Sequence, residues 1–253
     1  YETVDVPAEE DADAFLPPYQ ATNCFDFEHP KNIGYSAGPD YNRYFKYYEH
    51  RDMLGAFEAI DRVEARFAEC FGRAYTGPVE AVSCDDAEAV LVTLGSIAGL
   101  ARESVARLRE QGKRVGLLRI RYMRPFPAKL IAEALAGAAA VGVLEKDISF
   151  GAEGTVFTNV NSALQQAGCM VPTFNFVGGL GGDDITSAQM DAMFDALLDS
   201  VGERGRDDAA AGRSCDDAST GQGAGLGRVS FLGIDFSVAS QPACGDDCKE
   251  GAR

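Results

Sequence analysis

The sequence predicts an α/β fold in three layers, in which helices cover both faces of a mainly parallel, five-stranded sheet. The alternation of two kinds of segment supports this fold class. Between residues 76 and 201, short apolar segments alternate with longer segments whose apolar side chains recur every three or four positions. Strands that alternate with helices in this way are typical of right-handed crossovers between parallel strands. A last strand of the same domain is expected at residues 228–236.

Residues 1–41 are expected to form an extended arm. Prolines and acidic residues recur throughout this segment and argue against a helix. Aromatic residues are too frequent for a free linker, so we expect the arm to lie across a surface, such as that of another domain. They are Phe15, Tyr19, Phe25, Phe27, Tyr35 and Tyr41. Because the first residue is Tyr1 rather than an initiator Met, the sequence is interpreted as cut from a longer chain.

Residues 42–75 are expected to hold a long amphipathic helix. Its apolar side chains recur at helical spacing and form one stripe, at Leu54, Phe57, Ile60, Val63, Phe67 and Phe71. Gly72 is expected to end the helix, because glycine readily adopts the left-handed conformation of a C-terminal cap. An aromatic cluster of Tyr44, Phe45, Tyr47 and Tyr48 lies near its start.

Five strands are expected in the α/β domain. The first, residues 89–94, is a continuous apolar run, as in a strand that is covered on both faces. The others are residues 115–120, 141–144, 174–177 and 229–234, with the last at an edge of the sheet. Helices are expected at residues 97–112, after Pro127, at residues 153–167, and after a capping box formed by Thr186 and Gln189.

Two segments are predicted to be disordered. Residues 202–227 are rich in Gly, Ala, Ser and Asp and nearly lack large apolar side chains, and residues 237–253 are expected to form a loose tail. Cys215, Cys244 and Cys248 fall in these segments. Zinc and iron–sulfur sites need four ligands, so incidental thiols are favoured over a metal site, and a labile disulfide remains open.

The composition excludes several classes of protein. A formal net charge of −16 argues against nucleic-acid and anionic-membrane partners, because both would repel the chain. No apolar segment approaches the roughly 20 residues of a membrane span. The 7 cysteines are odd in number and widely scattered, unlike a secreted disulfide scaffold. Reduced thiols in the cytoplasm fit better.

A glycine-rich turn is the first candidate site. Gly178, Gly179, Gly181 and Gly182 follow a predicted strand and precede a helix, so their backbone N–H groups could cradle an anion. The spacing matches neither G-x-G-x-x-G nor a P-loop, and acidic residues follow at positions 183 and 184. A tight turn that packs closely on a neighbouring domain is therefore favoured.

Three arginines form the second candidate site. Arg119, Arg121 and Arg124 lie at the carboxyl end of a predicted strand, where α/β proteins often bind ligands. Alternation along the strand would place Arg119 and Arg121 on the same side, where they could bind a carboxylate or a phosphate of coenzyme A. Ion pairs within the chain or with a partner are favoured, because arginine is common at interfaces.

Glu145, Lys146 and Asp147 directly follow another predicted strand. Carboxylates at strand ends can act as acids or bases, but no His or Cys lies near in sequence to complete a site. His29 and His50 are the only histidines, and a lone His is more often structural than a ligand. No catalytic residue and no metal ligand is therefore assigned.

Several of these segments, in the same order, resemble the alpha subunit of pyruvate:ferredoxin oxidoreductases. Residues 116–127 resemble the family's GLLRIRxxRPFP stretch, and residues 86–96 resemble its DAExVLVxxGS strand and turn. Residues 176–186 are similar to its GLGGRDIT segment, with Asp183 in place of the usual basic residue. The acidic, Gly-rich insert and the Cys-containing tail depart from the family pattern.

The resemblance implies a domain similar to the carboxy-terminal domain of transketolase, which serves structure and assembly. The complex would decarboxylate pyruvate oxidatively to acetyl-coenzyme A and pass electrons to ferredoxin or flavodoxin, and its other domains or subunits would be the partners of this domain. Thiamine diphosphate, Mg and iron–sulfur clusters are expected elsewhere in the complex, and this chain is expected to bind none of them. Alternatives are the same domain for a branched-chain or aromatic 2-oxoacid, and a stand-alone module that binds an anion such as coenzyme A.

Overall fold

The computed structural model describes residues 4–21, 24–32, 34, 36–75, 77–207 and 229–232. The chain forms two compact units, which are described separately below. One unit comprises residues 1–78 and 122–125, and the other comprises residues 79–121 and 126–253. Tyr35, Cys215, Cys244, Cys248, residues 208–227 of the expected insert and residues 237–253 of the expected tail lie outside the described residues.

The described residues of the first unit form two helices, α1 (Glu9–Phe15) and α2 (Pro39–Phe71). The expectation of an arm without a helix was wrong, because the acidic residues in the first turn of α1 favour a helix by complementing its dipole. Helix α2 begins at Pro39 rather than at residue 42, since proline fits the first turn of a helix. It ends as predicted at Gly72, which is left-handed (φ 66°) and donates its N–H to Ala68 O at 2.9 Å.

Aromatic packing holds α1 against the carboxyl-terminal end of α2. The ring centroid of Phe15 lies 5.7 Å from that of Phe67 and 5.3 Å from that of Phe71, in edge-to-face contacts. The guanidinium of Arg66 lies over the Phe15 ring and donates to Ala14 O at 3.2 Å. Within this unit, the Tyr122 hydroxyl also donates to Glu64 Oε1 at 2.5 Å.

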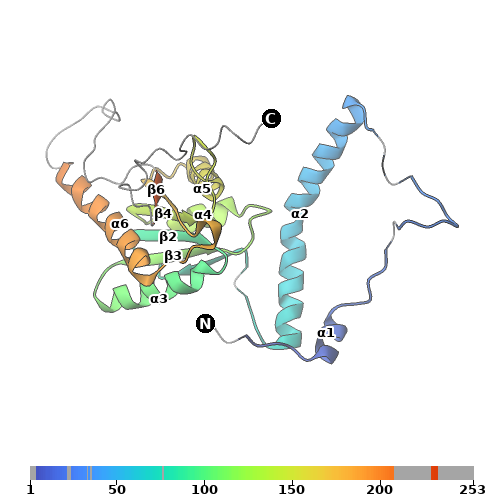
Figure 1. Cartoon of the computed structure of the whole chain (residues 1–253), viewed down its shortest axis with the longest axis horizontal. Coiled ribbons are helices and arrows are strands. Elements are labelled where there is room, and N and C mark those ends of the chain that lie inside the picture. Colours follow the sequence, from blue (N-terminus) through green and yellow to red (C-terminus); the bar gives the residue numbers. More distant parts are fainter. Residues whose placement is uncertain are drawn as a thin grey trace, which may run out of the picture. The chain divides into compact units, whose positions relative to one another are not determined.

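The second unit is built on a mostly parallel sheet with the strand order β1-β3-β2-β4-β5-β6 (Figure 1). Its strands are β1 (Val79–Val82), β2 (Ala89–Leu94), β3 (Val115–Ile120), β4 (Ala140–Glu145), β5 (Thr173–Val177) and β6 (Val229–Phe231). The described residues thus form six strands where five were expected. The additional strand, β1, is short, contains the charged Glu80 and pairs antiparallel with β3. Strand β6 lies at the other edge, as predicted.

Helices cover both faces of the sheet, which confirms the three-layer architecture. Helices α3 (Ile97–Glu110) and α6 (Ser187–Asp207) pack together on one face, and α4 (Ala128–Leu135) and α5 (Thr155–Gln166) pack together on the other (Figure 1). The capping box of α6 is confirmed, because Gln189 N–H donates to Thr186 Oγ1 and Thr186 N–H donates to Gln189 Oε1. Helix α6 continues to Asp207, so residues 202–207 are helical rather than disordered.

The core lies on both faces of β2, β3 and β4. Residues of β2 and β4 are almost entirely buried, which explains why these strands read as continuous apolar runs. Gly142 is required in β4, because a Cβ there would approach Phe176 Cε2 to 2.8 Å and Leu197 Cδ1 to 2.9 Å. The tight packing fixes the strands, and with them the segments that leave their carboxyl ends.

Candidate functional site

The candidate site lies where the chain leaves two neighbouring parallel strands in opposite directions. Strands β2 and β4 pair with each other, but β2 leads into α3 on one face and β4 leads into α5 on the other. Such a switch point opens a crevice at the carboxyl ends of the strands, where α/β proteins commonly bind ligands. A cavity of ≈ 350 Å³ lies here, lined by Leu94, Gly95, Ser96, Ile97, Leu144, Glu145, Lys146, Asp147, Val156 and Ile185.

Glu145 is the most constrained residue of this site. It is the last residue of β4, it is 4% exposed, and its carboxyl group meets the first turn of α5. The N–H of Val156 donates to Oε2 at 2.7 Å, and the N–H of Phe157 donates to Oε1 at 3.2 Å. Glu145 therefore satisfies helix N–H groups that have no partner within the helix.

Asn175 and Gly154 complete the surroundings of this carboxyl group. The side-chain amide of Asn175 donates to Glu145 Oε1 at 2.7 Å, and its oxygen accepts the N–H of Gly154 at 2.9 Å. Asn175 is fully buried on β5, and its amide also lies 3.3 Å from Val143 O. The network joins β4, β5 and α5, so its immediate role is to hold the start of α5 against the sheet.

Burial and, to a smaller degree, a hydrogen bond with Asp147 raise the pKa of Glu145 to about 7, although the hydrogen bonds from Val156, Phe157 and Asn175 act in the opposite direction. The pKa of Asp147 is lowered from its ordinary value. Burial by itself would raise that pKa, but hydrogen bonds from Glu145 and Thr155 outweigh it, and the Thr155 N–H donates to Asp147 Oδ2 at 3.2 Å. Asp147 therefore carries a negative charge near neutral pH. Glu145, by contrast, is mostly protonated below about pH 7.

Of the three arginines that the sequence grouped together, Arg119 alone lies on strand β3. Strand β3 ends at Ile120, so Arg121 lies beyond the strand and the predicted alternation does not apply to it. Arg119 forms an ion pair with Glu80 at 3.5 Å, and Glu80 also accepts two hydrogen bonds from Arg102 of α3, at 2.8 and 2.9 Å. Arg124 belongs to the other unit and donates to Met123 O at 2.7 Å. Binding of an anion by these residues stays a prediction.

The glycine turn packs closely on its own unit. A Cβ on Gly178 would lie 2.7 Å from Leu232 Cδ1, and a Cβ on Gly179 would lie 2.8 Å from Lys146 Cε. Gly179, Gly181 and Gly182 all have positive φ, which favours glycine at these positions. Gly181 and Gly182 have open space around them. Contact of this turn with a neighbouring domain stays a prediction.

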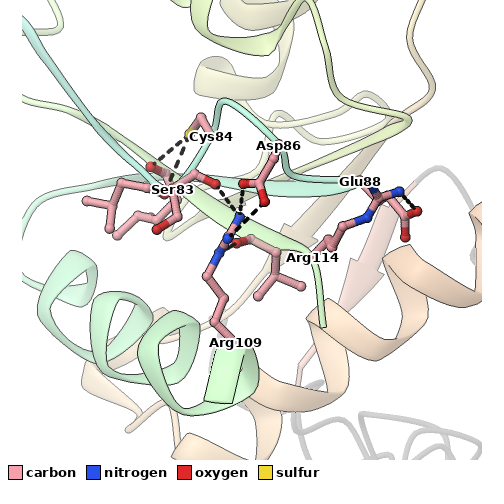
Figure 2. A network of polar contacts seen from close by, with 9 residues as sticks. Ser83, Cys84, Asp86, Glu88, Arg109 and Arg114 are labelled. Atoms are coloured by element: carbon pink, nitrogen blue, oxygen red, sulfur yellow. Dashed lines mark hydrogen bonds and ion pairs between the residues drawn. The ribbon is translucent and has the colours of Figure 1, made fainter. Parts of the chain in front are cut away.

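A second polar network fixes the connection between β1 and β2, and sequence reasoning missed it. Figure 2 shows Arg109 of α3 among Ser83, Asp86 and their neighbours. Arg109 donates to Val115 O at 2.7 Å, to Ser83 O at 2.8 Å and to Asp86 Oδ1 at 2.6 Å. The adjacent Cys84 thiol is buried, and burial raises its pKa to about 11, which opposes thiolate chemistry.

The described residues provide no metal centre. No three His, Cys, Asp or Glu side chains converge to hold an ion in this part of the chain. Cys24, Cys70, Cys84 and Cys169 are free thiols. Across the same residues, no helix combines the length and the apolar composition that a membrane span requires.

Comparisons with known proteins converge on one family. Residues 87–190 match the family model "Pyruvate:ferredoxin oxidoreductase core domain II". Pyruvate synthase subunit PorA of Methanothermobacter thermautotrophicus is 40% identical over 192 residues, which are 76% of this chain and 49% of that protein. Ketoisovalerate oxidoreductase subunit VorA of Pyrococcus abyssi is 36% identical over 194 residues, which are 76% of this chain and 49% of that protein.

The chain therefore spans about half the length of the curated relatives it matches. Among solved structures, a split-gene transketolase in the form of an inactive beta4 tetramer is similar at 16% sequence identity and a TM-score of 0.41, covering 51% of this chain and 45% of that chain.

Proposed function

The chain belongs to the pyruvate:ferredoxin oxidoreductase family through its core domain II, and from this premise we propose that it is the assembly domain of an alpha-type subunit. The complete complex would decarboxylate pyruvate oxidatively to acetyl-coenzyme A and transfer electrons to ferredoxin or flavodoxin. This chain would supply contacts rather than chemistry. Its partners would be the other domains or subunits of the same complex.

The observation that carries this proposal is the exposure of α2. None of the residues in this 33-residue helix is buried. Its amino-terminal half presents several large apolar side chains, each at least 43% exposed, at Tyr41, Tyr44, Phe45, Tyr47, Tyr48, Met53 and Leu54. Exposed apolar surface of this extent is typical of a protein–protein interface.

The arm supports the same interpretation. Tyr19, Phe25 and Phe27 are 92%, 79% and 89% exposed. Aromatic side chains are enriched at protein interfaces, where they contribute a large contact area at a small loss of side-chain entropy. Arm and helix together would therefore present an aromatic surface to the rest of the complex.

The described residues do not fit the redox cofactors of such a complex. An iron–sulfur cluster requires four thiolates, but no group of metal ligands converges in the described residues, and the pKa of the buried Cys84 is raised. We therefore assign no step of electron transfer or of thiamine diphosphate chemistry to the described residues. Those cofactors would be held elsewhere in the complex.

Pyruvate is proposed as the substrate because the pyruvate synthase relative is 40% identical to this chain, against 36% for the ketoisovalerate relative. The test is 2-oxoacid-dependent reduction of a viologen dye by the complete complex, with pyruvate and ketoisovalerate compared. The proposal predicts the higher kcat/KM with pyruvate and loss of assembly and activity when this region is deleted. Full activity of a complex that lacks the region would refute the assembly role.

A further inference from the structure

The cavity at the carboxyl ends of β2 and β4 has an apolar wall made of side chains from four parts of the second unit. Leu94, Ile97, Leu144, Val156 and Ile185 line it, and Val156 and Leu144 are buried. Its volume of ≈ 350 Å³ is at the lower end of the range of roughly 300–1,000 Å³ for small-molecule pockets. The small volume and the apolar wall together therefore suit a short aliphatic group.

Two opposite charges border the same cavity. Lys146 is exposed, has no carboxylate partner among the described residues, and lies along the glycine turn beside Gly179. Asp147 is half-buried and accepts the Thr155 N–H at 3.2 Å as well as hydrogen bonds from the side chains of Glu145 and Thr155, which leaves the remaining lone pair of its carboxylate for a further donor. No ion pair joins the side chains of Lys146 and Asp147, although the two residues are adjacent in sequence and line one cavity.

The third ionisable residue of the cavity, Glu145, already has hydrogen-bond partners. Its carboxyl oxygens accept from Val156, Phe157 and Asn175, so it contributes to the shape of the wall rather than to a free binding position. A ligand would therefore meet one ammonium group, one carboxylate and an aliphatic wall. A monocarboxylate would leave Asp147 without a counter-charge, and an amine would leave Lys146 without one.

We propose that this cavity binds a small aliphatic zwitterion, an α-amino acid with a branched apolar side chain. Its carboxylate would pair with Lys146, its ammonium group would pair with Asp147, and its side chain would contact Leu94, Ile97 and Ile185. Charge-assisted hydrogen bonds at both ends would fix the orientation of the ligand. The lining of this site belongs to the second unit, whereas α2 belongs to the first. Binding there involves no step of the oxidoreductase reaction, so the proposal extends the proposed function to ligand sensing.

The test is direct titration of the full 253-residue chain with L-leucine, followed by methyl NMR of Leu, Ile and Val side chains. We expect a dissociation constant on the order of 1 mM, with shifts concentrated on Leu94, Ile97, Leu144, Val156 and Ile185. We expect 4-methylpentanoate, which lacks the ammonium group, and 3-methylbutylamine, which lacks the carboxylate, each to bind at least about tenfold more weakly.

Lys146→Gln is expected to weaken leucine binding about tenfold, because it removes a charge-assisted contact. Lys129→Gln on α4 is the matched control, since Lys129 is 87% exposed in its side chain and lies outside the cavity. The proposal is wrong if leucine shifts none of the five methyl-bearing residues, if 4-methylpentanoate or the amine binds as tightly as leucine, or if both lysine variants weaken binding equally. Each of these results leaves the assembly role of α2 unaffected.

Discussion

The carboxyl group of Glu145 occupies the space that a side chain at position 154 would need. A Cβ on Gly154 would lie 2.1 Å from Glu145 Cδ, far closer than two carbon atoms can approach. Gly154 is also the residue before α5, and its N–H donates to Asn175. The absence of a side chain at position 154 thus allows a buried glutamate to reach the first turn of the helix.

Gly154→Ala is therefore expected to destabilise the second unit by about 1–3 kcal/mol, as overpacking of a filled site does. The free energy of unfolding can be measured by urea denaturation monitored by circular dichroism. Gly137→Ala is the control, because a Cβ at that position meets nothing within 4 Å. Equal stability of the two variants would show that Glu145 can move away at little cost.

The stability of the second unit is expected to fall as the pH rises from 5 to 8. Burial raises the pKa of Glu145 from 4.5 to about 7, so the folded protein binds this proton more tightly than the unfolded chain does. The resulting stabilisation is complete below about pH 4.5 and is lost as the pH rises through about 7. It amounts to up to about 3 kcal/mol for a shift of this size.

Glu145→Gln tests the source of this pH dependence, because the amide cannot ionise but retains an oxygen that accepts a helix N–H. Urea denaturation at pH 5 and pH 8 should show a smaller loss of stability in the variant than in the unsubstituted chain. The lowered pKa of Asp147 acts at more acidic pH and does not contribute in this window. An identical pH dependence in both proteins would contradict the assignment.

Arg109 is expected to contribute more to stability than its neighbour Arg114. Arg109 donates to two backbone carbonyls and to Asp86, whereas Arg114 forms an ion pair with the side chain of Glu88 on the surface. Arg109→Gln should lower the melting temperature by about 3–6 °C, and Arg114→Gln should lower it much less. Thermal denaturation followed by circular dichroism gives the comparison, and a larger effect at Arg114 would refute it.

The elements that the sequence predicted well are those in which burial dictates the pattern. Strand β2 is buried on both faces and reads as an unbroken apolar run, and the capping box of α6 places its two partners three residues apart. Strand β1 escaped notice because it is an edge strand with Glu80 in the middle. Helix α1 was not predicted because acidic residues among prolines are typical of a segment without a helix, whereas in the first turn of α1 they stabilise the helix.

The candidate site was harder to predict because its contacts are distant in sequence or involve the backbone. Glu145 was noticed, but its partners are two N–H groups of α5 and Asn175, 30 residues further along the chain. Because every residue except proline has a backbone N–H group, the residue types do not reveal which of these groups act as donors. Arg119 likewise pairs with Glu80, 39 residues away, in a strand that the sequence did not reveal.

We propose that α2 docks this chain onto the rest of its complex. The affinity of the chain for the remaining subunits tests this role most directly. Phe45→Ser combined with Tyr48→Ser removes two exposed aromatic side chains from α2, and both residues belong to the first unit. Tyr75→Ser is unsuitable as a control, because Tyr75 packs on Phe67. Lys129→Gln on α4 serves instead, since its side chain is largely exposed on the other unit.

Surface plasmon resonance with the immobilised partner subunits should show affinity reduced at least about 30-fold by the double substitution, as expected when two aromatic interface side chains are lost, and unchanged affinity for Lys129→Gln. If the double variant instead binds as tightly as the unsubstituted chain, then α2 is not the docking surface and the assembly account is wrong.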